Sequence, residues 1–223
     1  MSPDEAAADA QPTWRELAVA RSLDPARARA ENRVQRYLDA AFELMNSDSG
    51  EFTVQEVVER SGQSLRGFYQ YFDGKNELLL ALFEESVGEA VEDLEAVAGG
   101  DSDPLERLRA FTVRLHEWCD PTDAPRKRGS HNRRPIMEFS VQLAVNHGER
   151  VRAAMAPISR QLLQLVDAAT AAGAISVADT HRAASLIEQT VMYSWFGNRL
   201  VTDARRRVTA QETWEFCLHG LGG

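Results

Sequence analysis

The chain has 223 residues, of which 43% are hydrophobic and 26% charged, and its formal net charge is −9. These values exclude a disordered chain, and no apolar run approaches the ~20 residues of a membrane-spanning helix. The acidic start has no apolar signal segment, so we expect a cytoplasmic protein. Cys119 and Cys217 lie far apart in the sequence, which excludes a disulfide framework and a cysteine-rich zinc site.

Helical signals follow an acidic, alanine-rich N-terminal extension, residues 1–24, which we expect to be partly mobile. Asp24-Pro25 is typical of an N-cap followed by proline at the first helical position, and predicts that a helix begins there. The capping-box sequence Thr53-Val-Gln-Glu56 predicts a second helix, which ends at Ser61-Gly62. A third, short helix is expected from Ser64.

The rest of the chain also has helical spacing and shows no sustained alternation typical of strands. Glycines and prolines divide it into predicted helices at 75–98, 103–119, 136–146 and 149–172, with a proline-containing loop at 120–135. Capping-box sequences at Ser176 and Thr209 predict the last two helices. The sequence therefore predicts an all-α protein of about nine helices.

Residues 53–72 contain two short helices joined by a glycine turn, a pattern typical of a helix-turn-helix. The longer run TVQEVVERSGQSLRGFYQYFDGKNELLLALFEE, residues 53–85, resembles the signature of the TetR family of transcriptional regulators. The resemblance implies a DNA-binding domain at 25–74 and a ligand-sensing and dimerisation domain at 75–223. Leu65 and Arg66-Gly67 depart from the commonest family pattern, which leaves the operator sequence open.

The resemblance also implies which residues contact DNA. Hydroxyl groups and a lysine at helix starts suit phosphate oxygens, whereas side chains on the exposed face of the recognition helix suit base edges. The expected phosphate contacts are Thr53, Ser64, Tyr69, Tyr71 and Lys75. The expected base-edge contacts are Leu65, Arg66, Gly67 and Gln70.

Residues 13–75 contain nine basic and ten acidic residues, so the predicted DNA-binding segment is nearly neutral. Any contact with DNA must therefore come from individually placed side chains and not from a generally basic surface. The basic run RKRGSHNRR at 126–134 is either a solvated loop or an additional phosphate contact, and a solvated loop is the more common case. For Arg27, Arg29 and Arg33, a solvated helix face and a contact to flanking phosphates remain equally open.

The second domain is rich in large apolar residues, which form either a plain core or the lining of a pocket. The resemblance implies a small-molecule inducer, and the composition favours a lipophilic one. The candidate ligand-binding residues are Phe111, Leu115, His116, Trp118, Phe139, Gln142, Leu143, Asn146, Met155, Tyr193, Trp195 and Phe196. The family pattern also implies a homodimer formed through the last two helices.

Other functions have weaker support. The chain contains no GxGxxG, P-loop, GxSxG or HExxH motif, so we expect neither an enzyme nor a cofactor. His116 and Cys119 share a helix face, but two ligands do not make a metal site. The acidic balance leaves one alternative open, an all-helical interaction module that does not bind DNA.

Overall fold

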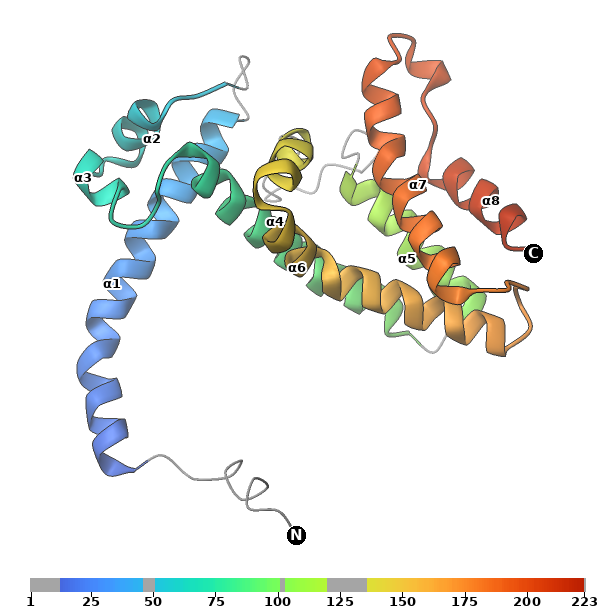
Figure 1. The fold of residues 1–223 in the computed structure, drawn as a ribbon, viewed down its shortest axis with the longest axis horizontal. Coiled ribbons are helices and arrows are strands. Elements are labelled where there is room, and N and C mark those ends of the chain that lie inside the picture. Colours follow the sequence, from blue (N-terminus) through green and yellow to red (C-terminus); the bar gives the residue numbers. More distant parts are fainter. Residues whose placement is uncertain (1–12, 46–50, 101–102, 120–135, 223) are drawn as a thin grey trace. The chain divides into compact units, whose positions relative to one another are not determined.

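The computed structural model describes residues 13–45, 51–100, 103–119 and 136–222 (Figure 1). This part of the chain contains helices and no strand, which confirms the predicted all-α fold. The chain divides into two compact units, residues 1–74 and 75–223. None of the described helices is both long and apolar enough to cross a bilayer.

The first unit contains α1 (Trp14–Met45), α2 (Val54–Ser61) and α3 (Leu65–Phe68). α1 packs against α2, and α2 against α3. The buried side of α1 begins at Tyr37 and continues through Ala41 to Met45. These side chains, together with Val57 and Phe68, form the core of the unit.

The predicted helix start at Asp24-Pro25 is wrong, because α1 begins at Trp14 and contains Pro25 in its interior. The segment before the proline, WRELAVARSL, consists largely of strong helix formers, which extend the helix in spite of the missing N–H of proline. Residues 1–12 of the expected N-terminal extension lie outside the described residues, as does the loop predicted at 120–135.

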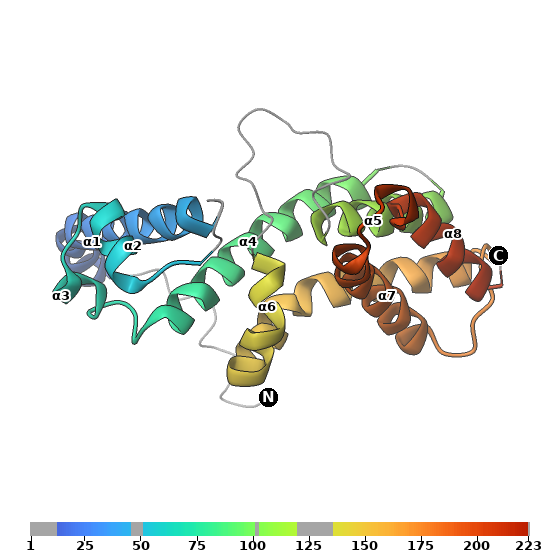
Figure 2. The same ribbon diagram turned by 90° about the horizontal axis from the view of Figure 1, so that it is seen from above.

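The second unit contains α4 (Lys75–Ala98), α5 (Pro104–Cys119), α6 (Ile136–Ala171), α7 (Thr180–Leu200) and α8 (Ala210–Gly220). A short 3-10 helix, η1 (Ala204–Arg206), lies between α7 and α8. α5 is central, because it contacts α4, α6, α7 and α8, while α6 lies along α4 (Figures 1 and 2).

Local signals account for most of the ends of these helices. α6 includes both helices predicted around Gly148, and its backbone leaves helical geometry at His147 (φ −136°, ψ 38°). The Asp103 carboxylate accepts a bond from the Glu106 N–H at 3.1 Å and so begins α5 as expected. At α7 the predicted capping box is wrong: Asp179 is the N-cap, and its carboxylate accepts from the Arg182 N–H at 3.0 Å.

Candidate nucleic-acid interface

The ends of α2 are held by the groups that the sequence predicts. The Thr53 hydroxyl oxygen accepts from the Glu56 N–H at 3.3 Å, and the Glu56 carboxylate accepts from the Thr53 N–H at 2.7 Å. At the other end Gly62 has φ 65°, a left-handed conformation that glycine adopts without the strain of a Cβ. The helix is therefore bounded by a capping box and a glycine turn, within ten residues of sequence.

α3 is a single helical turn that is held in place from behind. Ser64 caps it, with its hydroxyl oxygen accepting from the Gly67 N–H at 3.0 Å. Phe68 is fully buried and meets the ring of Tyr37 edge-on at 5.5 Å between centroids. The Tyr37 hydroxyl donates to the Ser64 carbonyl at 2.9 Å, so α1 fixes the start of α3.

The side of α3 that faces away from this core carries exposed side chains. Leu65 is 43% exposed and Tyr69 is 57% exposed, although both are large and partly apolar. Arg66 and Gln70 are also exposed. An apolar, a cationic, an amide and an aromatic side chain thus share one solvent-facing turn, a combination suited to base edges and phosphates.

The remaining candidate contacts are more constrained. The Thr53 and Ser64 hydroxyl oxygens already accept bonds as caps. Tyr71 is half-buried, and its hydroxyl accepts from the Arg33 Nε at 3.2 Å. A Cβ on Gly67 would lie 2.8 Å from the Tyr37 hydroxyl oxygen, so this position faces the core. Lys75 is the first residue of α4 and belongs to the second unit.

The sequence analysis omitted Tyr37 although this residue positions the interface. Its signal was present, because Tyr37, Ala41 and Leu44 have the i, i+4, i+7 spacing of one helix face. A tyrosine on such a face usually finds a partner for its hydroxyl, and here burial raises the Tyr37 pKa. What the sequence did not show is that this partner is the backbone of the recognition helix.

The helix-turn-helix geometry agrees with a family model. Residues 38–82 match the family described as bacterial regulatory proteins, tetR family. This match covers the helix-turn-helix and the start of α4. The matched residues include all of α2 and α3, and so they contain the exposed turn described above.

Several solved structures have the same fold as this chain. A TetR/AcrR regulator from Thermobifida fusca aligns with a TM-score of 0.64 at 20% identity, over 85% of this chain and 96% of that one. RolR in complex with resorcinol aligns with a TM-score of 0.61 at 18% identity, over 87% of this chain and 90% of that one. FadR from Bacillus subtilis, in complex with stearoyl-CoA, aligns with a TM-score of 0.58 at 17% identity, over 83% of this chain and 98% of that one. No curated protein sequence matches this chain.

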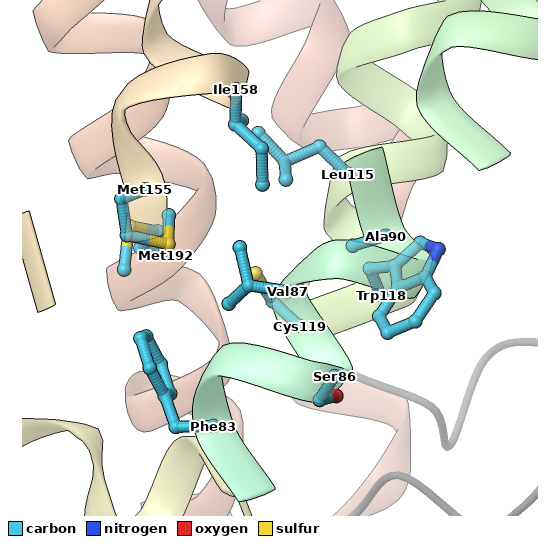
Figure 3. A pocket seen from close by; sticks show the side chains of 10 residues that line it. All are labelled: Phe83, Ser86, Val87, Ala90, Leu115, Trp118, Cys119, Met155, Ile158 and Met192. Atoms are coloured by element: carbon cyan, nitrogen blue, oxygen red, sulfur yellow. The ribbon is translucent and has the colours of Figure 1, made fainter. Parts of the chain in front are cut away.

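The second unit contains a small, partly open cavity among α4, α5, α6 and α7 (Figure 3). Met155 and Met192 lie side by side on one side of it, and Trp118 lies on the other (Figure 3). The cavity volume is about 40 Å³, which is room for about three water molecules. Drug-sized ligands occupy roughly 300–1,000 Å³, so such a ligand requires the helices to move apart.

Only some of the residues predicted for the pocket line this cavity. Leu115, Trp118 and Met155 do, whereas the other predicted residues whose side chains are described do not. Phe111, His116, Leu143 and Trp195 are buried elsewhere in the unit, while Gln142, Asn146, Tyr193 and Phe196 are exposed. The side chain of Phe139 lies outside the described residues.

Most of the additional lining comes from α4, which the sequence analysis did not consider for the pocket. Phe83, Val87 and Ala90 follow the i, i+4, i+7 spacing of one face of α4. Spacing alone does not distinguish such a face from an ordinary core. The remaining lining residues are Ser86, Cys119, Ile158 and Met192.

Trp118 is fixed as a wall of the cavity by a charged network outside it. The Trp118 indole N–H donates to the Asp93 carboxylate at 2.9 Å. Arg114 donates to the same carboxylate at 2.6 Å and 3.1 Å, and these bonds raise the Arg114 pKa. The polar atom of the indole is thus already bonded, which leaves the ring to contribute apolar surface. Within the described residues, no cluster of side chains is suited to hold a metal ion.

Proposed function

We propose that this protein is a cytoplasmic repressor that binds a palindromic operator as a homodimer and is released by an apolar small molecule. The observation that carries this proposal is the contrast within α3, where Phe68 is buried and its neighbours Leu65 and Arg66 are exposed. A turn anchored by an aromatic core and bare on its other side has the geometry needed to enter a major groove.

Arg66 is the strongest candidate for reading sequence. A guanidinium group can donate two bonds to guanine, worth roughly 1–3 kcal/mol of discrimination, and Leu65 suits a thymine methyl. Because Gly67 faces Tyr37, reading falls to Leu65, Arg66 and Gln70. The phosphate contacts proposed for Thr53, Ser64, Tyr69, Tyr71 and Lys75 fix the position of α3 without reading bases.

The experiment compares two variants on two duplexes of equal length, an operator selected from genomic fragments and a random sequence. We expect Arg66→Ala to lose about 10-fold or more in preference for the operator. Lys75→Ala should weaken binding to both duplexes by a similar factor, because phosphates carry no sequence information. Equal losses for both variants on both duplexes contradict this division. Failure of the wild type to bind any duplex at low salt favours an interaction module instead.

Homodimerisation is proposed through α7 and α8. The exposed apolar residues Leu186, Tyr193 and Leu200 recur every seven positions along α7, which places them near one line on the helix. Leu186 lines a groove of about 560 Å³ between α7 and α8, whose other wall includes Phe216. A symmetric pair covers this surface and supplies the second recognition helix that a palindrome requires.

An apolar inducer is supported by the lining of the cavity, in which Ser86 contributes the one side-chain hydroxyl. In solved structures of this fold, RolR binds resorcinol and the FadR of B. subtilis binds stearoyl-CoA. A panel of phenols and acyl-CoA compounds therefore tests release from the selected operator. We expect Ala90→Val, which fills part of the cavity, to weaken release without weakening operator binding. Unchanged release contradicts this site.

A further inference from the structure

The N-terminal part of α1 extends beyond the core of the first unit (Figure 1). From Leu23 to Arg36 its described side chains are exposed or half-exposed, and the first fully buried position is Tyr37. A helix in water gains most of its stability by packing an apolar face, and from Leu23 to Arg36 no described side chain is fully buried. Its exposed charges therefore decide what it can bind.

Three arginines lie along one face of this segment. Arg29, Arg33 and Arg36 have the spacing i, i+4, i+7, and all three are exposed. We call them the arginine face. At 3.6 residues per turn, Asp24 and Glu31 lie about 160–180° around the helix from Arg33, on the opposite side.

The nearby acidic groups have other partners, and Asp39, three residues after Arg36, accepts a bond from the Gln35 amide at 3.0 Å. Glu31 pairs with Arg27 at 2.8 Å, on the far side of the helix. Glu43, farther along α1, pairs with Arg60 of α2 at 3.1 Å. Within the described residues, neither Arg29 nor Arg36 takes part in a hydrogen bond or an ion pair. In a chain with a net charge of −9, this is a locally uncompensated positive surface.

Two contacts from this part of α1 reach the residues on either side of α3. The Arg33 Nε donates to the Tyr71 hydroxyl at 3.2 Å, and its guanidinium carbon lies 6.0 Å from the centre of the Tyr71 ring. One turn further along, Tyr37 donates to the carbonyl of Ser64 at the start of α3. At 3.6 residues per turn, Arg29 and Arg36 lie about 40° and 60° around the helix from Arg33, on the side away from Tyr37, so the face borders the side of α1 that holds α3.

We propose that the arginine face is a second phosphate-binding surface, which holds the DNA backbone beside the base pairs that α3 reads. This inference rests on the proposed function. The ligand is argued from charge complementarity, because guanidinium groups pair with phosphates through two parallel bonds. Contacts of this kind add affinity without sequence preference and make binding depend on salt.

The test uses the full chain and the double variant R29Q/R36Q, which keeps Arg33 as the partner of Tyr71. The matched control is R27Q/R60Q, which removes the same charge from two exposed arginines that pair with carboxylates. Binding to the selected operator and to a random duplex is measured from 50 to 300 mM salt. Circular dichroism confirms that both variants fold.

We expect R29Q/R36Q to weaken binding to both duplexes by about 10-fold or more, with the operator preference unchanged. The slope of log K against log salt should fall by about 1.8 per bound chain, because each lost phosphate contact removes about 0.9. The control should keep the slope of the wild type.

Three outcomes overturn the proposal. An unchanged slope for R29Q/R36Q contradicts phosphate binding by the arginine face. It does not contradict the proposed function, since Arg66→Ala tests base reading independently. If the slope falls by the same amount in the control R27Q/R60Q, the effect is one of general charge and not of the arginine face. A wild type that binds neither duplex at low salt overturns the arginine face and the proposed function together.

Discussion

Two surfaces of this protein carry exposed large apolar side chains, and the residues beside these side chains distinguish the two surfaces. On α3, Leu65 and Tyr69 lie beside Arg66 and Gln70, within one short turn. On α7, exposed apolar residues recur every seven positions and continue toward Phe216 of α8. Exposed apolar side chains that cluster in this way are typical of binding surfaces. The arrangement of polar groups around them indicates which one suits DNA and which one suits a second protein chain.

The largest expected effect tests the protein side of this comparison. Phe216 is 72% exposed, and burying a phenylalanine contributes about 1.5–3 kcal/mol per copy, twice over in a symmetric dimer. Phe216→Glu should therefore weaken dimerisation by at least about 100-fold, as sedimentation equilibrium would show, and abolish operator binding at nanomolar concentrations.

Val145→Glu is the control for this variant, because Val145 is also exposed but lies on α6. It should leave the dimer intact. A Phe216→Glu protein that still sediments as a dimer would contradict the proposed interface.

An intermediate effect tests how α3 is held from behind. In Gly67→Ala the new methyl group would lie 2.8 Å from the Tyr37 hydroxyl oxygen. Such overpacking costs about 1–3 kcal/mol, which exceeds the 0.5–1 kcal/mol by which alanine favours a helix over glycine. We expect denaturant unfolding to show a loss of about 1 kcal/mol, with weaker operator binding.

Tyr37→Phe removes the oxygen that causes this clash, together with its bond to Ser64. In that background, Gly67→Ala should cost clearly less than in the wild type, because the closest contact is gone and only the Ser64 Oγ, at 3.1 Å from the new Cβ, opposes the helix preference of alanine. Additive losses in the double variant would show that the contact between Tyr37 and Gly67 does not constrain α3.

The smallest effect concerns Glu188, on the side of α7 that faces α6 rather than the α7–α8 groove. Its carboxylate accepts from the Ser159 hydroxyl at 2.9 and 3.0 Å, and burial raises the Glu188 pKa. A raised pKa in the folded state means that the protonated form is favoured there. The stability contributed by protonation is therefore lost as the pH rises above about 4.5, the ordinary glutamate value.

Glu188→Gln should consequently be more stable than the wild type at pH 7, with a difference that shrinks toward pH 4. Denaturant unfolding at several pH values measures this, and Glu149→Gln on the exposed surface of α6 is the control. Dimerisation and operator binding should remain unchanged. A pH-independent difference between Glu188→Gln and the wild type would contradict the assigned cause.

Sequence reasoning succeeded best where the determining contacts are local. The capping box at Thr53, the glycine turn at Gly62 and the start of α3 at Ser64 all depend on groups a few residues apart. The same reasoning failed at Asp24-Pro25 and at Ser176, where a local capping signal competed with other signals nearby. At α7, Asp179 supplies a cap directly before the helix, so the serine three residues earlier is not needed.

The cavity was predicted less well, because residues far apart in sequence form it. Phe83 of α4, Leu115 of α5 and Met192 of α7 meet only after the helices pack. Apolar spacing on one helix has the same form in a solid core and in a cavity wall. Gln142 and Tyr193 illustrate this limit, since both were expected at the pocket and both are exposed.

The sequence alone determined the helical class, most helix ends and the recognition turn, since propensity, capping and glycine conformation act over a few residues. Only the tertiary structure decided that Tyr37 holds the start of α3, that Gly67 faces inward and that the cavity involves α4. These features depend on which helix faces meet. That meeting is governed by how buried side chains of distant segments fit together, which no local pattern records.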